Sequence, residues 1–178
     1  MTRIVNIVAG PGAGKTTLAA LLFGEAKVAG ASVEYVQEYA KKLVWLRDFD
    51  QLNNQHMVSL KQYRLLDSMR GLVDWVITDG SLLHGLWFNR HNPDNVSDQR
   101  KTEASILSWF RSFDNVTLFL ERGGVPYEHA GRLEDLPTAR RIDEGLKALL
   151  AEHGVPFTAI RQGVDARSLL AEIGIGRA

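Results

Sequence analysis

Residues 9–17 of this 178-residue chain read Ala-Gly-Pro-Gly-Ala-Gly-Lys-Thr-Thr, and this stretch decides the fold. Before it stands the apolar run Arg-Ile-Val-Asn-Ile-Val-Ala at 3–9, and after it an amphipathic segment that predicts a helix over 16–29. A run rich in β-branched residues is typical of a strand buried on both faces of a parallel sheet. A glycine-rich turn between such a strand and a helix indicates a phosphate-binding loop. The sequence therefore predicts a P-loop, with Ala9 in the place of the usual first glycine.

Each residue type in this loop has a physical task toward a nucleotide. Glycines let backbone N–H groups converge on phosphate oxygens at the helix N-terminus. We expect Lys15 to neutralise the transferring phosphoryl group and the Thr16 hydroxyl to hold Mg²⁺. The chain contains no Asn-Lys-x-Asp motif of the kind that reads guanine, so ATP is the expected nucleotide. The predicted nucleotide-binding residues are Gly10, Pro11, Gly12, Ala13, Gly14, Lys15, Thr16, Thr17 and Arg122.

The rest of the chain alternates between strand and helix patterns. Further strands are predicted over 32–37, 73–78, 115–120 and 156–161, and helices over 98–113, 138–153 and 165–173. The segment from 38 to about 71 is predicted to be mostly helical. This alternation is typical of an α/β fold with a doubly wound parallel sheet. We predict a P-loop NTPase fold over 1–178 as one domain, with a five-stranded parallel sheet of order 2-3-1-4-5 and helices on both faces.

Composition narrows the classes of protein. Hydrophobic residues make up 45% of the chain, which is enough to build a sizeable core. The 21 basic and 21 acidic residues cancel, so there is no global field for non-specific nucleic-acid binding. The absence of cysteine excludes disulfides and thiolate chemistry, and the five histidines show no zinc-ligand spacing. With no apolar run long enough to span a membrane, we expect a cytoplasmic protein that has no membrane partner.

Two carboxylates follow predicted strands, at the sheet edge where open α/β proteins bind ligands. Asp79 follows the strand at 73–78 and is the predicted metal-side carboxylate; alternatively it is the N-cap of the next helix. Glu38 follows the strand at 32–37 and is the predicted acceptor of a proton from a substrate hydroxyl; alternatively it is an ordinary acid in the first turn of a helix.

A short lid is predicted over about 123–141, because this stretch is rich in Gly, Pro and charged residues. Arg122 and Arg132 lie in the loop after the fourth strand, and Arg140 and Arg141 begin the helix that follows. Guanidinium groups brought in by a closing loop stabilise the charge that develops during phosphoryl transfer. For Arg140 and Arg141 the alternative is a solvated basic helix start.

Four stretches together resemble one family: the loop at 9–17, Val-Gln-Glu-Tyr-Ala-Lys at 36–41, Val-Ile-Thr-Asp-Gly-Ser at 76–81 and Ala-Gly-Arg at 130–132. It is the family of phage-encoded and NadR-like P-loop kinases, related to nicotinamide riboside and thymidylate kinases. Within it, the chain is most similar to kinases that phosphorylate 5-hydroxymethyluracil in phage DNA. The resemblance implies that Lys15 and Thr16 serve ATP and Mg²⁺, Glu38 the acceptor hydroxyl, Asp79 the metal and Arg132 the phosphates. It also implies the host cytoplasm as the site of action.

The acceptor is left open between DNA carrying a modified pyrimidine and a free nucleoside or nucleotide, and a regulatory ATPase switch is the alternative to a kinase. Neutral net charge gives little attraction to duplex DNA. Two local basic groups offset this: Lys41, Lys42, Arg47, Lys61 and Arg64, and Arg90, His91, Arg100 and Lys101. Residues able to stack on or read a base are Trp45, Gln62, Tyr63, Trp87 and Phe88, although core positions are the alternative for Trp45, Trp87 and Phe88.

Overall fold

A computed structural model describes residues 2–124, 126–127 and 133–176. Its single sheet has five parallel strands in the order β2-β3-β1-β4-β5, which confirms the predicted fold class and strand order. The strands are β1 (Arg3–Val8), β2 (Val33–Val36), β3 (Trp75–Thr78), β4 (Asp114–Glu121) and β5 (Thr158–Arg161).

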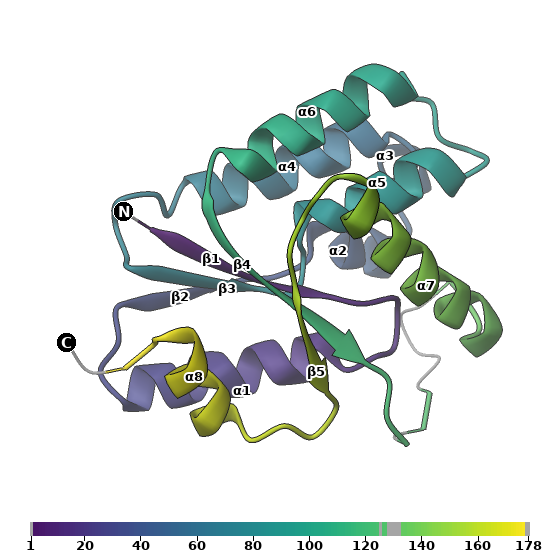
Figure 1. The fold of residues 1–178 in the computed structure, drawn as a ribbon. Coiled ribbons are helices and arrows are strands. Elements are labelled where there is room, and N and C mark those ends of the chain that lie inside the picture. Colours follow the sequence, from purple (N-terminus) through teal and green to yellow (C-terminus); the bar gives the residue numbers. More distant parts are fainter. Residues whose placement is uncertain (1, 125, 128–132, 177–178) are drawn as a thin grey trace.

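Helices cover both faces of the sheet (Figure 1). On one face lie α1 (Lys15–Val28) and α8 (Ala166–Ile173). On the other lie α4 (Gln55–Asp67), α5 (Leu82–His91), α6 (Gln99–Arg111) and α7 (Leu136–Glu152). Two short helices, α2 (Tyr39–Leu46) and α3 (Phe49–Leu52), lie between β2 and α4 along the chain. Among the described residues, none of the helices combines the length and the apolar character needed to cross a membrane.

The alternation of side chains along β1 divides the core in two. Ile4 and Val8 pack into the cluster beneath α5, α6 and α7, whereas Val5 and Ile7 pack into the cluster beneath α1 and α8. All four are at most 1% exposed. Successive strand residues point to opposite faces, so a central strand covered on both sides must be apolar throughout. The polar exception is the buried Asn6, which accepts a hydrogen bond from the Ser81 hydroxyl.

The segment predicted as mostly helical is divided into three helices by polar caps. α2 ends at Arg47, whose φ of 55° is left-handed. Asp48 caps α3 by accepting from the Gln51 N–H, and Asn54 caps α4 by accepting from the Met57 N–H. Side-chain oxygens at these positions satisfy backbone donors that a helix start leaves unpaired. Residues from all three helices line one cavity.

Two features differ from the sequence-based prediction. α5 was not predicted; it begins after Ser81, whose hydroxyl accepts from the Leu83 N–H. The helix predicted over 138–153 begins earlier, because α7 starts at Leu136, capped by Asp135. Within the predicted lid, residues 125 and 128–132, including Arg132, lie outside the described residues.

Candidate active site

The loop between β1 and α1 has the backbone shape of a phosphate cradle. Gly12 and Gly14 have φ angles of 75° and 95°, in the left-handed region that glycine enters without steric cost. Lys15 is the first residue of α1, and its ammonium folds back to donate to the Gly10 carbonyl at 3.2 Å. Its side chain is buried, so the charge lies inside the loop rather than in solvent.

Gly12 is further constrained by an aromatic ring. A Cβ at this position would lie 2.3 Å from the ring of Tyr127, so no larger residue fits there with the ring in place. The Tyr127 hydroxyl donates to the Glu134 carbonyl at 2.7 Å. Tyr127 therefore covers the phosphate loop and connects it to the segment that leads into α7.

Asp79 links three parts of the site at the end of β3. The Thr16 hydroxyl donates to one of its carboxylate oxygens at 2.5 Å, and the Glu38 backbone N–H donates to the other at 3.0 Å. Burial, followed by the charge of Asp79, raises the pKa of the nearby Tyr35 hydroxyl and keeps this phenol neutral. Asp79 does not cap α5, because Ser81 does, so the helix-cap alternative for Asp79 is wrong. A hydroxyl and a carboxylate this close supply the oxygen donors that Mg²⁺ prefers.

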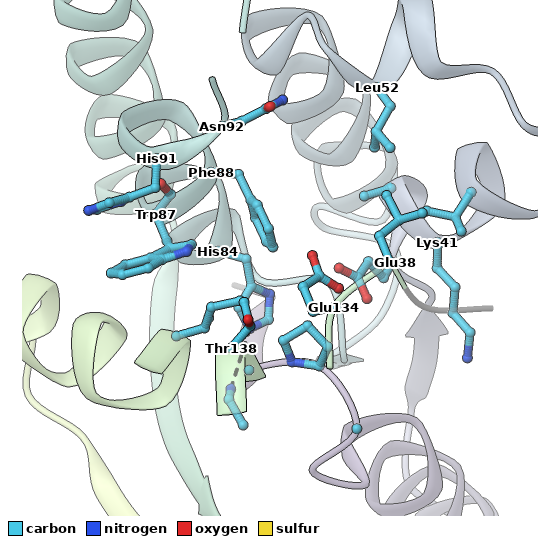
Figure 2. Close-up of a pocket in the computed structure, with 18 of the residues that line it drawn as sticks. Glu38, Lys41, Leu52, His84, Trp87, Phe88, His91, Asn92, Glu134 and Thr138 are labelled. Carbon is cyan, nitrogen blue, oxygen red and sulfur yellow. Dashed lines mark hydrogen bonds between the residues drawn. The ribbon is translucent and has the colours of Figure 1, made fainter. Parts of the chain in front are cut away.

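Glu38 occupies the N-cap position of α2, but its side chain makes no capping hydrogen bond. It lines a cavity instead (Figure 2), so the alternative of an ordinary first-turn acid is wrong. Burial raises the pKa of its carboxyl group; Lys15 opposes this effect and Asp79 adds to it. Burial likewise lowers the pKa of Lys15, against the attraction of Glu38 and Asp79. A carboxylate with a raised pKa is better matched to accept a proton near neutral pH.

An ion pair between Arg122 and Asp143 holds the start of the phosphate loop. The Gly10 N–H donates to Asp143 of α7 at 2.6 Å, and Asp143 also pairs with Arg122. Arg122 in turn donates to the Pro11 carbonyl at 2.5 Å. The two side chains are 14% and 11% exposed. In this structure Arg122, predicted to bind nucleotide, contacts the Asp143 carboxylate and the Pro11 carbonyl. Asp143 was not singled out from the sequence.

A cavity of about 750 Å³ opens from the phosphate loop toward α2, α3, α5 and α7. Glu38 and Glu134 point into the space between His84 and Phe88 on one side and Lys41 and Leu52 on the other (Figure 2). A volume of this size is typical of a small-molecule site. The loop residues Gly10, Pro11, Gly12, Gly14, Lys15, Thr16 and Thr17 line the same cavity.

Two of the predicted base-reading aromatic residues line the cavity, and the others do not. Trp87 and Phe88 on α5 contribute to its wall, and Trp87 approaches α7 so closely that a Cβ on Gly145 would lie 1.7 Å from its ring. Trp45 is 62% exposed, so a core position is wrong for it. Tyr63 stacks on Trp109 at 5.2 Å between ring centroids, away from the cavity.

The polar residues predicted near the acceptor also differ in their surroundings. Gln62 is buried and holds the backbone on either side of Glu38, accepting from the Tyr39 N–H and donating to the Gln37 carbonyl. Arg90 is bound by two carboxylates at 2.7 Å each, Glu103 and Glu152, which removes it from the second basic group. In the lid region Arg140 and Arg141 are both exposed, and of the two only Arg141 lines the cavity.

His84, in the first turn of α5, is a cavity residue that sequence reasoning missed. It is 6% exposed, and its Nε2 accepts from the Ala9 N–H at 3.4 Å. Burial, followed by the Lys15 charge, moves the pKa of its imidazole well below the ordinary value. The available signal was its position five residues after Asp79, in the first turn of a helix that the sequence pattern did not predict.

The site thus brings together a phosphate loop, a hydroxyl–carboxylate pair for a metal, and a cavity that the half-buried Glu38 and the loop both line. Comparison with known protein families finds a match to the AAA domain over residues 4–167, which is most of the chain. A comparison with curated proteins gave no match. A P-loop domain of this kind binds ATP, usually with Mg²⁺. The phosphate loop, the parallel sheet and the family match together place this chain in the AAA domain family of P-loop nucleotide-binding proteins.

Proposed function

We propose that this protein is an ATP-dependent kinase acting, as one domain, on a hydroxyl of a second substrate. The observation that carries the proposal is the cavity of about 750 Å³, which begins at Lys15 and Thr16 and contains Glu38. The cavity extends beyond the phosphate loop toward α2, α3, α5 and α7, whereas an ATPase switch needs room only for its nucleotide and a water. Glu38 is half-buried and lines the same cavity as Lys15 and Thr16, which supports a meeting point of hydroxyl and γ-phosphate beside it.

The loop would hold the donor, and its neighbours would stabilise developing charge. Backbone N–H groups of the loop bind the phosphates of ATP, and Lys15 balances the charge of the γ-phosphoryl group. Thr16 and Asp79 would hold Mg²⁺, which when bound neutralises charge on the β- and γ-phosphate oxygens. Arg122, held by Asp143, would keep the loop in shape, and Arg132 would bring a further positive charge to the phosphates.

The transfer itself is an in-line displacement. The acceptor oxygen attacks the γ-phosphorus, the bond from that phosphorus to the β,γ-bridging oxygen breaks, and ADP leaves. The hydroxyl proton passes to the Glu38 carboxylate, whose raised pKa suits it to take the proton.

For the acceptor we propose the 5-hydroxymethyl group of 5-hydroxymethyluracil in DNA. Phe88 and Trp87 offer the cavity an aromatic wall against which an extruded base can stack. Outside the cavity, Lys42, Arg47, Lys61 and Arg64 form no salt bridge with any residue that the structure describes, so they are available to phosphates. A free nucleoside or nucleotide is the second candidate, because the cavity alone is large enough to enclose one.

The test of acceptor identity is incubation with ATP labelled at the γ-phosphate. The panel consists of DNA containing 5-hydroxymethyluracil, the same DNA with thymine, free 5-hydroxymethyl-2′-deoxyuridine and common nucleosides. Label in the modified DNA alone supports the first candidate, and label in free nucleosides supports the second. Release of labelled phosphate to water with every acceptor would refute the kinase and favour the switch.

The test of the proton acceptor compares Glu38→Gln with Glu34→Gln. Both remove a carboxylate near β2, but Glu34 pairs with Lys27 on the surface at 3.0 Å. We expect Glu38→Gln to lower the transfer rate about 100-fold or more while leaving ATP affinity within about threefold. Glu34→Gln should leave both unchanged. Full transfer by Glu38→Gln would disprove the assignment of Glu38.

A further inference from the structure

The His84 ring carries a polar atom with no partner inside the protein. The side chain is 6% exposed, and its Nδ1 has no hydrogen-bond partner among the residues that the structure describes. A buried polar atom left without a partner is costly, and native proteins rarely retain one without a use. His84 lines the main cavity, into which it projects from α5 (Figure 2). The missing partner is therefore to be sought on a molecule bound in the cavity.

The hydrogen bond at Nε2 determines which kind of group Nδ1 can bind. The Ala9 backbone N–H can only donate, so the Nε2 atom that faces it must be the acceptor nitrogen. A neutral imidazole with an unprotonated Nε2 carries its proton on Nδ1. The ring stays neutral, because burial and the Lys15 ammonium both lower its pKa. His84 therefore carries a fixed N–H donor, on a buried nitrogen without a free lone pair, in the wall of the cavity.

The neighbours of His84 indicate which part of a ligand reaches it. One turn further along α5, Phe88 lines the cavity beside it, and Trp87 lies next to Phe88. On the other side is Lys15, close enough that its charge lowers the His84 pKa. A flat base stacked against these aromatic rings, with its hydroxyl toward Lys15, would turn a polar edge to Nδ1.

We propose that His84 selects the acceptor base by donating its Nδ1–H to the 4-carbonyl oxygen of a 4-oxo-pyrimidine. The edge of a 4-oxo-pyrimidine such as a uracil offers an acceptor at this place, whereas a 4-amino-pyrimidine such as a cytosine offers an N–H that would face the imidazole N–H. Sites built around one hydrogen bond reject analogues that cannot make it, because the buried partner is left unpaired. This inference rests on the proposed function in placing a pyrimidine in the cavity.

The experiment measures binding and transfer separately. Dissociation constants of 5-hydroxymethyl-2′-deoxyuridine and 5-hydroxymethyl-2′-deoxycytidine are measured by calorimetry in the presence of a non-hydrolysable ATP analogue. The native protein is compared with His84→Phe, which keeps ring size without polar atoms, and with His84→Asn, whose amide N–H can replace Nδ1–H. His56→Phe is the matched control, because His56 packs against Trp109 outside the cavity.

We expect the native protein to bind the uridine at least about tenfold more tightly than the cytidine. His84→Phe should weaken uridine binding about 10- to 100-fold and cytidine binding little, and His84→Asn should recover part of the loss. The ATP analogue should bind native and variant within about threefold. Equal native affinities, equal weakening of both nucleosides, or weaker binding of the ATP analogue would each overturn the role of His84.

The outcomes separate this inference from the kinase proposal. If no acceptor is phosphorylated while uridine binding still depends on His84, the kinase proposal is refuted and the base-selection proposal is supported. If native and His84→Phe protein phosphorylate 5-hydroxymethyluracil equally well, the kinase proposal is supported and the base-selection proposal is refuted.

Discussion

The buried pair of Asp143 and Arg122 allows a stability change to be worked out from the structure. Asp143→Ala would leave Arg122 as a charge at 14% exposure without its carboxylate, and would free the Gly10 N–H. Removing one partner of a buried pair costs about 3–5 kcal/mol of unfolding free energy. Because some solvent reaches the pair, we expect the lower end, about 3 kcal/mol. For a chain of this size that corresponds to a fall in Tm of about 6–12 °C.

The assay is urea denaturation followed by circular dichroism, with Glu34→Ala as the matched control. Glu34 also pairs with a cation, Lys27, but both side chains are more than 40% exposed, so its removal should cost about 1 kcal/mol or less. The double variant Arg122→Met, Asp143→Leu should regain most of the loss, because it removes both charges. If Asp143→Ala costs no more than Glu34→Ala, or if the double variant is less stable than either single variant, the pair does not hold the loop as argued.

Further predictions follow from the buried charges. Lys15→Met should abolish ATP binding yet stabilise the nucleotide-free protein in denaturation, because burial lowers the Lys15 pKa; the gain should shrink as alkaline pH deprotonates the native lysine. Glu38→Gln should raise Tm increasingly as pH rises above the ordinary glutamate pKa, because the native pKa is raised; a Tm difference that does not grow with pH would contradict this. Below pH 6.5, the native protein should lose up to about 1.4 kcal/mol of stability per pH unit relative to His84→Phe, because only the unfolded chain takes up that proton. Asp79→Asn should lower transfer about 100-fold and raise the Mg²⁺ concentration needed, measured with labelled ATP.

Local pattern was sufficient for much of the fold. The β1 strand, the glycine loop and the start of α1 are neighbours in the chain, so their hydrophobic run and glycines predicted a P-loop directly. Asp79 and Glu38 were also placed correctly at strand ends, because parallel strands bring their carboxyl ends to one edge of the sheet. The strand order was predicted together with the P-loop fold, and the structure confirms it.

Pattern was less informative where caps and tertiary contacts decide. α5 was missed because its signals are a serine cap at Ser81 and a short run of mixed residues that includes Gly85. The exposure of Trp45 also went against its residue type, since it lies in the last turn of α2, before the cap at Arg47, and faces solvent. Such outcomes depend on how short helices pack against the rest of the chain, which single-sequence periodicity does not report.

By itself the sequence determined that a phosphate loop joins a doubly covered strand to a helix, because steric and hydrogen-bonding requirements act between adjacent residues. Only the tertiary structure showed that Asp143, 133 residues from Gly10, holds the loop, and that Ala9 sets the tautomer of His84. These contacts join residues far apart in sequence, and they depend on the distance and burial of two particular atoms. Neither quantity is encoded in residue type or spacing, so the donor side could be predicted from the sequence, whereas the wall of the acceptor cavity required the folded chain.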